Sequence, residues 1–346
     1  MAQDPGATPC SLRSLSLEQP ASVEVTVIIP TKDRLWSLPK AVESCRSRSI
    51  GTEIIVVDDG STDGTADWLT TQQDLVVLQG HGWGKPAAVN QAQRQARGKY
   101  VRFLDSDDWL NQGQNEAQYQ AAVRTDADVV LSGVDVYADD VFERRVDYSQ
   151  TDDFIAQQLG EEDASHYSSF LFRGELVADI PHRTHFPASD FASRDDRCFM
   201  LEVALRKPKT AVTETPALCH RHHTRGRLQA QTGLKSAGTH IQQLYVYRQI
   251  LRLLEENGEL TVRRRRAATG VLWPLAHWLA YADLEEATNL VTWIRTLDPE
   301  FSPPNGGALG ILYRQLGFKF TERLLALRRR ALRVLRPVGL AAPMGH

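Results

Sequence analysis

Short hydrophobic runs alternate with helical patterns over the first third of the chain. Four runs rich in β-branched residues are typical of buried strands: 23–30, 52–59, 75–78 and 100–104. Between them, apolar positions recur at helical spacing over three stretches: 37–48, 61–73 and 85–97. Strand–helix–strand units in this order predict an α/β fold, in which helices cover both faces of a mostly parallel sheet.

The pattern changes along the rest of the chain. One more helical stretch and a strand at 128–136 lie within 110–150, and helical spacing returns from about 236 to 300. The sequence predicts five parts: a disordered tail at 1–22, an α/β domain at 23–225 with halves 23–110 and 111–225, a helical region at 226–302, a linker at 303–309 and an amphipathic basic helix at 310–337.

Polar side chains follow the predicted strands. Thr31 and Asp33 come after the first strand, and Asp58 and Asp59 end the second. The fourth strand runs into the sequence DSDD at 105–108. Because ligands bind beyond the carboxyl ends of parallel strands, these groups are expected to line one acidic site.

The DSDD cluster is typical of a divalent cation site. Unpaired carboxylates at close range repel one another, and a cation removes that repulsion. Mg²⁺ and Mn²⁺ prefer oxygen ligands and share them with substrate phosphates, so the sequence predicts one of these ions together with a nucleoside diphosphate. The alternative is an acidic surface turn that caps the following helix.

Composition narrows the class of protein. The net charge of −3 gives no general attraction to nucleic acid. Four sparse cysteines without a C-x-x-C pair indicate free thiols in a reducing cytosol. No signal peptide is visible, and the longest apolar stretch is too short to span a bilayer. These features predict a cytoplasmic protein.

Several segments, taken in order, resemble the large inverting glycosyltransferase family 2, of GT-A fold. They are VTVIIPTKDR (25–34), EIIVVDDGSTDGT (53–65), AAVN (87–90), GKYVRFLDSDDW (98–109) and, more loosely, SRDDRCFMLEVAL (193–205). The resemblance implies a Rossmann-like catalytic domain with a C-terminal helical extension. It also implies hexosyl transfer, with inversion, from a nucleotide-diphosphate sugar, favouring UDP, to a hydroxyl of a saccharide or lipid-linked saccharide, as in surface polysaccharide or glycolipid synthesis.

The resemblance also assigns roles at the donor site. Asp59 would hydrogen-bond the base, and Asp105 and Asp107 would hold the ribose and the metal. The donor-binding residues it implies are Pro30, Thr31, Asp33, Asp58, Asp59, Lys85, Asn90, Asp105 and Ser106. The metal ligands it implies, for Mn²⁺ or Mg²⁺, are Asp105, Asp107, Asp108 and His223. The family's arginine position holds Val89 here, for which the point charge of Lys85 would compensate.

An inverting transfer needs a carboxylate base near the acceptor hydroxyl. The resemblance places it at Asp196, the second residue of an acidic pair at a helix start, with Asp195 and Asp190 as alternatives. Asp at this position is also a common structural cap. The segment CHRHHTRGR (219–227) matches a family motif in which His223 would complete the metal shell and His220 replaces a tyrosine, or it is an ordinary polar loop.

Two other functions stay open. A sugar nucleotidyltransferase would need a glycine-rich turn after the first strand, which VIIPTKDR lacks. A nucleotide-sugar-binding module without catalysis would have no need of the D-x-D. The last helix carries seven basic residues against Glu322 over 319–336, so it is expected either to contact the inner face of an anionic membrane peripherally or to pack on the protein.

Overall fold

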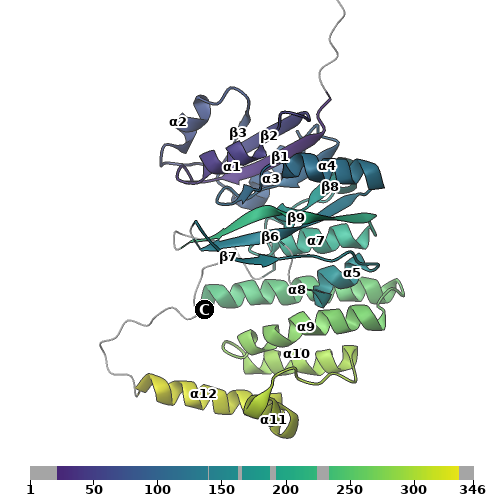
Figure 1. Ribbon diagram of the computed structural model, residues 1–346. Coiled ribbons are helices and arrows are strands. Elements are labelled where there is room, and N and C mark those ends of the chain that lie inside the picture. The colour runs from purple at the N-terminus through teal and green to yellow at the C-terminus, as the bar shows by residue number, and fades with distance from the viewer. Residues whose placement is uncertain (1–21, 139, 163–165, 188–191, 224–233, 335–346) are drawn as a thin grey trace, which may run out of the picture.

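The computed structural model describes residues 22–334, apart from 139, 163–165, 188–191 and 224–233. Figure 1 shows a sheet with helices on both sides, followed by a stack of C-terminal helices. The predicted tail, the alternative base Asp190 and the end of the CHRHHTRGR segment lie outside the described residues.

Four parallel strands form the first half of the sheet, in the order β3-β2-β1-β4. Their bounds are β1 Val25–Thr31, β2 Thr52–Asp58, β3 Val76–Gln79 and β4 Tyr100–Phe103. Every residue of β1 is buried, as expected for a strand with a neighbour on each edge and a helix on each face. The helices between them are α1 Leu38–Cys45, α2 Thr65–Thr70 and α3 Lys85–Gln93. The predicted α/β alternation is confirmed.

The second half of the sheet is mixed rather than parallel. It adds β8 Leu171–Arg173, β6 Val129–Ala138, β9 Thr210–His222 and β5 Trp109–Leu110, with β7 Val141–Val146 paired to β6. Strands β6 and β9 are parallel, but the β4–β8, β8–β6, β6–β7 and β5–β9 pairs are antiparallel. The sheet is therefore mostly parallel only in its first half. Among the antiparallel pairs, β6 and β7 are joined by a short connection, which allows only an antiparallel return.

Helical elements cover this half of the sheet. They are α4 Gln114–Thr125, α5 Phe154–Ala156, η1 Gln157–Glu161, η2 Tyr167–Ser169, α6 Gly174–Val177 and α7 Asp195–Leu205. The C-terminal stack then follows, with α8 Leu234–Glu256, α9 Val262–Leu279, α10 Leu284–Leu297, α11 Gly307–Leu316 and α12 Phe318–Val334.

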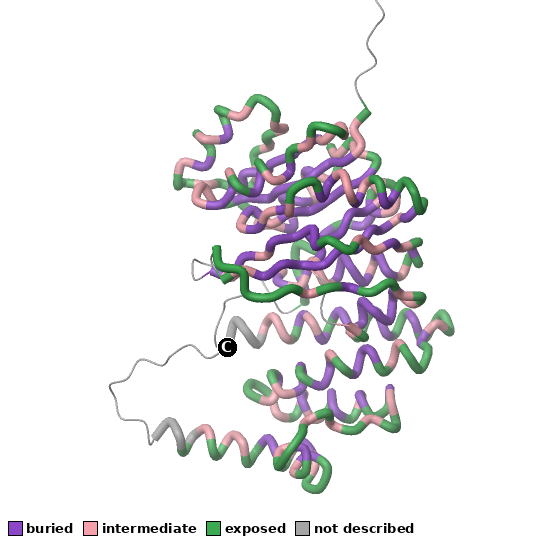
Figure 2. Tube along the Cα trace, viewed as in Figure 1, coloured by how far each residue is buried: buried purple, intermediate pink, exposed green. Residues whose placement is uncertain are grey.

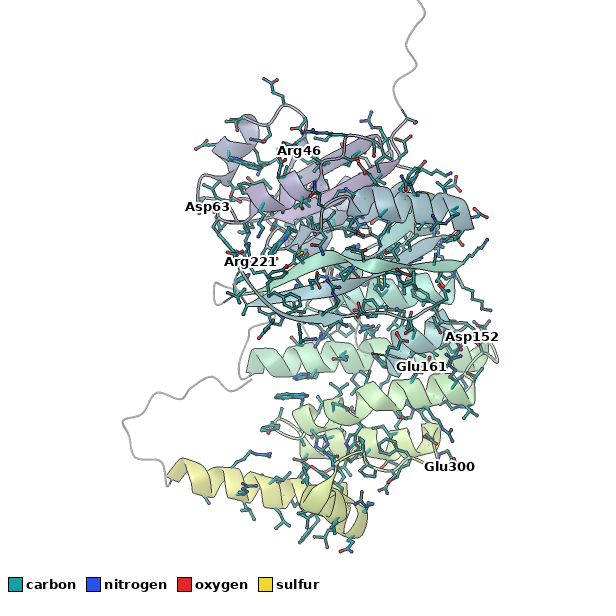
Figure 3. All side chains as sticks on the ribbon, viewed as in Figure 1. Arg46, Asp63, Asp152, Glu161, Arg221 and Glu300 are labelled. Carbon is teal, nitrogen blue, oxygen red and sulfur yellow. The ribbon has the colours of Figure 1, made fainter. Side chains whose placement is uncertain are left out.

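The C-terminal stack shares its core with the sheet domain. Buried residues from Val25 to Phe318 form one hydrophobic cluster, and Figure 2 shows burial continuing from the strands into α8, α9 and α10. Ion pairs reinforce the junction: Arg263 of α9 pairs with Asp152 and Glu161, which Figure 3 labels beside α5. The predicted helical region is thus packed on the sheet domain.

The prediction of a single amphipathic helix over 310–337 is wrong in one respect. Gly317, with φ 76° and ψ 170°, separates α11 from α12. Glycine adopts this backbone conformation without the steric cost that a side chain would add. Across the residues that the structure describes, every helix is too short or too polar to span a bilayer.

Candidate active site

The carboxyl ends of β1 and β2 bring the first two polar clusters together. Thr31 and Asp58 are register partners, and the backbone N–H of Asp59 donates to the Thr31 carbonyl at 2.9 Å. Asp33 accepts from the backbone N–H of Thr62, in the turn after β2, at 2.7 Å. Asp58 accepts from the backbone N–H and the side-chain hydroxyl of Ser61, in the same turn, at 3.0 and 2.6 Å. The predicted residues therefore lie at one edge, where Asp33 and Asp58 stabilise the turns.

Asp59 holds the loop that follows β3. Its two carboxylate oxygens accept from the backbone N–H groups of Gly82 and Gly84, each at 2.8 Å. Both glycines have positive φ, 72° and 87°, which favours glycine over other residues at these positions. Each of these oxygens has a second lone pair, so Asp59 can also accept a hydrogen bond from a nucleotide base while it holds the loop.

The glycine loop delivers Lys85 to the acidic cluster. Lys85 Nζ lies 2.5 Å from Asp105 Oδ1, and both side chains are mostly buried. Burial alone would lower the pKa of Lys85, but the charges of Asp105, Tyr167, Asp195 and Asp196 outweigh it and raise that pKa well above its ordinary value. The groups whose charges act on Lys85 come from three parts of the chain. The end of β4 and the start of α7 therefore face the same site.

Burial also acts on Asp105, in the opposite direction. It would raise the pKa of this carboxyl, but the charge of Lys85 lowers that pKa overall. Asp105 is therefore an ionised carboxylate at neutral pH, held by a lysine that a phosphate group could also attract.

Asp107 meets the end of β9. His223 Nε2 lies 3.0 Å from Asp107 Oδ2, and the imidazole side chain is 1% exposed. Arg34, in the turn after β1, is 3.8 Å from the same carboxylate oxygen. The histidine packs edge-on against Trp36 with ring centroids 4.9 Å apart. The structure thus brings together Asp107 and His223, which are more than a hundred positions apart in the sequence.

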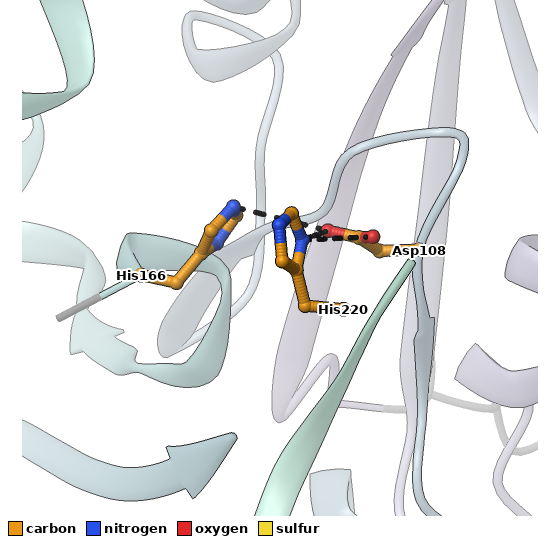
Figure 4. A group of neighbouring side chains, drawn as sticks. All are labelled: Asp108, His166 and His220. Carbon is orange, nitrogen blue, oxygen red and sulfur yellow. Dashed lines mark hydrogen bonds and ion pairs between the residues drawn. The ribbon is translucent and has the colours of Figure 1, made fainter. Parts of the chain in front are cut away.

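Asp108 is more deeply buried and is surrounded by histidines (Figure 4). It is 2% exposed and accepts from the backbone N–H of Arg221 at 2.8 Å. His220 Nδ1 lies 3.0 Å from Asp108 Oδ2, and His166 Nε2 lies 3.8 Å from the same oxygen. Burial lowers the pKa of His166, which is therefore neutral at neutral pH.

These side chains fit a divalent cation. One oxygen from each of Asp105, Asp107 and Asp108 lies within 4.8 Å of the others, and Asp107 adds the imidazole nitrogen of His223 at 3.0 Å. Carboxylate oxygens with one imidazole suit Mn²⁺ and Mg²⁺ better than softer ions. A second group, Asp108 with His166 and His220, also lies within this spacing. His166 Nδ1, however, accepts from the backbone N–H of Ser168, so Nε2 carries the proton.

The acidic pair at the start of α7 is divided between two roles. Asp195 is 5% exposed, and its Oδ2 lies 3.2 Å from Nδ1 of the fully buried His182. Asp196 is less buried and accepts from the backbone N–H of Arg197 at 2.7 Å. Both carboxylates benefit from the positive end of the helix dipole. Asp196 is the member of the pair without a buried side-chain partner among the hydrogen bonds described.

The remaining predicted donor residues have mainly structural contacts here. Asn90 uses both ends of its amide on the backbone of His182, at 2.8 Å each, so it fixes that segment rather than pointing to a phosphate. Pro30 is buried in β1, and the Ser106 carbonyl accepts from the Ser37 hydroxyl at 2.8 Å. Val89, in the family's arginine position, is completely buried.

Three side chains of the site were not predicted: Arg34, His166 and His182. Arg34 lies within the VTVIIPTKDR segment and could have been found from it. His166 and His182 reach the site only because η2 and the loop before α7 fold back over β4, as their contacts with Asp105 and Asp195 show. No spacing in the sequence indicates that return.

Known proteins are similar to this chain in sequence and in fold. Residues 26–190 match glycosyl transferase family 2. The chain is similar to EpsH of Bacillus subtilis, which is named as a glycosyltransferase, with 24% identity over 74% of this chain and 75% of EpsH. It is also similar to the poly(ribitol-phosphate) beta-glucosyltransferase of Bacillus spizizenii, with 24% identity over 55% of this chain but only 31% of that protein.

A solved structure shows the same fold. TarS 1–349 of S. aureus, in complex with UDP-GlcNAc, matches with a TM-score of 0.53 and 15% identity over 88% of this chain and 92% of that one. The predicted GT-A-type α/β fold with C-terminal helices is therefore confirmed. The family match and the named relatives agree: residues 26–190 of the chain are similar to glycosyl transferase family 2, and both relatives are named as glycosyltransferases.

Proposed function

We propose that the chain transfers a hexosyl unit, with inversion, from a UDP-sugar to a hydroxyl of a saccharide or lipid-linked saccharide. The observation that carries this proposal is the meeting of Asp107 with His223 at 3.0 Å, beside the Lys85–Asp105 pair and the start of α7. A metal site, a phosphate-attracting lysine and a candidate base then face one another.

The donor would lie along the carboxyl edge of β1, β2 and β4. Thr31 and Asp33 flank the base, Asp59 accepts a hydrogen bond from the base, and Asp105 accepts from the ribose. Lys85 is the cation placed to attract the diphosphate in the absence of an arginine at position 89. Asn90 and Asp58 support these groups through the backbone.

A Mn²⁺ or Mg²⁺ ion would be held by Asp107 and His223, with Asp105 or Asp108 able to contribute an oxygen. When bound, such an ion neutralises charge on the departing diphosphate. Arg34, which is 3.8 Å from Asp107, adds positive charge on the same side. Without the ion, the protein itself offers His223 as the partner that keeps Asp107 in place.

Asp196 is the proposed general base. It would take the proton of the acceptor hydroxyl as the oxygen forms its bond to the anomeric carbon and the bond to the diphosphate breaks. Asp195, tied to His182, would position the start of α7 rather than accept that proton.

The names of similar proteins indicate acceptors to test first. One is a poly(ribitol-phosphate) beta-glucosyltransferase, and the structure of TarS was solved with UDP-GlcNAc. A surface polysaccharide or a related phosphate polymer is therefore the proposed acceptor class, and UDP-glucose and UDP-GlcNAc are the first donors to assay.

A donor panel tests the proposal. The chain should hydrolyse or transfer from one UDP-sugar in the presence of Mn²⁺ or Mg²⁺, and much less with the GDP-sugars. Release of pyrophosphate from UTP and a sugar phosphate would instead favour a nucleotidyltransferase. Binding of UDP-sugars without turnover on any acceptor would favour a binding module.

A further inference from the structure

Helix α12 has two distinct faces. Phe318, Thr321 and Glu322 are 5% exposed or less and, together with the partly buried Leu325, face the rest of the protein. Phe320, Leu324 and Leu327 are 51, 39 and 60% exposed. At about 100° per residue, this second set is centred roughly opposite the first. The apolar stripe of α12 therefore faces away from the core.

The rotation of α12 is fixed by a buried polar contact. Glu322 Oε1 lies 2.7 Å from both Nδ1 of His277 and the Tyr313 hydroxyl. Turning the helix to bury its apolar stripe would expose this carboxylate and break both contacts. The outward position of Phe320, Leu324 and Leu327 is thus set by the packing of α9 and α11 against α12.

Positive charge borders the stripe. On the helical wheel the exposed Arg323 and Arg328 flank it on opposite sides. Glu322, which is buried, is the sole acidic residue in the sequence between 307 and 334.

We propose that α12 docks this face, Phe320–Leu324–Leu327 flanked by Arg323 and Arg328, onto the surface of an anionic lipid bilayer. An apolar stripe between basic side chains matches the acyl boundary and the negative headgroups of such a surface. The helix would lie in the plane of the membrane and not cross it.

Charge argues against two other occupants. A second copy packed by twofold symmetry would bring Arg323 and Arg328 against the same residues of its partner, which is unfavourable. The chain's own residues 335–346 contain one arginine and no acidic residue, so they offer no complementary charge.

Vesicle flotation of the full chain tests the proposal, without donor or acceptor. The wild-type chain should float with phosphatidylcholine vesicles in which phosphatidylglycerol makes up about a third of the lipid, and remain unbound with phosphatidylcholine alone. Replacing Phe320, Leu324 and Leu327 together by Ser should weaken partitioning by about 10²-fold. Arg323→Glu with Arg328→Glu should weaken it by at least about 10-fold, and added salt should act in the same direction.

A matched control uses exposed apolar residues elsewhere. Val141 and Phe142 on β7 are 72 and 52% exposed, and replacing both by Ser should leave partitioning unchanged. Thermal unfolding of each variant should match the wild type, since the altered side chains are exposed. No flotation of the wild type with anionic vesicles, or equal flotation of the triple-Ser variant, would overturn the proposal. So would a wild-type dimer that the triple-Ser variant converts to a monomer. The flotation assay does not measure donor turnover. A failure of the membrane-docking proposal is therefore distinguishable from a failure of the proposed function.

Discussion

At the edge of the sheet, three carboxylates from one turn lie within reach of one another, whereas the described C-terminal helices α8–α12 bury one carboxylate, Glu322. Asp105, Asp107 and Asp108 face Lys85 and histidines that come from distant parts of the chain. Glu322 is enclosed by His277 and Tyr313 from the same helical stack. Both regions bury charge, but only the first gathers several like charges.

The difference separates a site for chemistry from a contact for packing. The single buried carboxylate of Glu322 accepts two hydrogen bonds at Oε1, and Arg329 lies 3.8 Å from Oε2, so groups of the protein already compensate its charge. Several carboxylates together are costly unless a cation or a cationic ligand joins them. We therefore expect substitutions at the sheet edge to affect turnover strongly and stability weakly, and substitutions around Glu322 to do the reverse.

The largest effect should come from Asp107→Ala. It removes the carboxylate that meets His223, and a divalent ion contributes several kcal/mol to the stabilisation of a departing diphosphate. Turnover should fall by about 10³-fold, and Mn²⁺ should no longer strengthen UDP binding. Calorimetric titration of UDP with and without Mn²⁺ measures this. Unchanged metal dependence would remove Asp107 from the metal site.

Asp196→Asn should rank second. The amide cannot take the acceptor proton, so turnover should fall by at least about 10²-fold while UDP binding stays as in the wild type. Steady-state assays at saturating donor check the turnover. Asp195→Asn is the paired variant, because it alters the contact with His182 and leaves Asp196 in place. A larger loss in Asp195→Asn than in Asp196→Asn would exchange the two roles.

Asn90→Ala should affect stability more than the donor. It removes two hydrogen bonds to the backbone of His182 and leaves those backbone groups without their partner. The free energy of unfolding should drop by about 1–3 kcal/mol, with the affinity for UDP little changed. Urea unfolding and UDP titration together decide this. A large loss of UDP affinity in a folded variant would restore Asn90 to the donor site.

Glu322→Gln should have the smallest effect on turnover and a modest effect on stability, about 1–2 kcal/mol at neutral pH. Burial would raise the pKa of Glu322, but hydrogen bonds from His277 and Tyr313 lower it overall. A carboxyl with a lowered pKa stabilises the fold above its unfolded-state pKa and loses that contribution as the pH falls. The stability difference between wild type and variant should therefore shrink below pH 4.5. A constant difference across pH would contradict this account.

Much of the first half of the molecule could be predicted from the sequence. The β-branched runs gave the parallel strands, and the polar residues after them, Asp59 and Asp105 to Asp108, do lie at one edge. The β-branched runs and the helical spacing are local patterns, so they carry this information without any long-range contact.

The rest depended on contacts between distant segments. The antiparallel return of β8 beside β4, and the arrival of His166 and His182 at the site, follow from how η2 and the loop before α7 fold back. The apolar stripe of α12 was visible in the sequence, but whether it packed inward depended on Glu322 and on the break at Gly317. Local patterns identify such faces without showing which one the core covers.

The most direct test of the central claim is a crystal structure with UDP and Mn²⁺, using anomalous scattering to locate the ion. The account predicts a manganese peak between the Asp107 carboxylate and His223 Nε2, at about 2–2.3 Å from each, and contacting the diphosphate. A peak elsewhere on the protein, or UDP bound away from the ends of β1, β2 and β4, would contradict it.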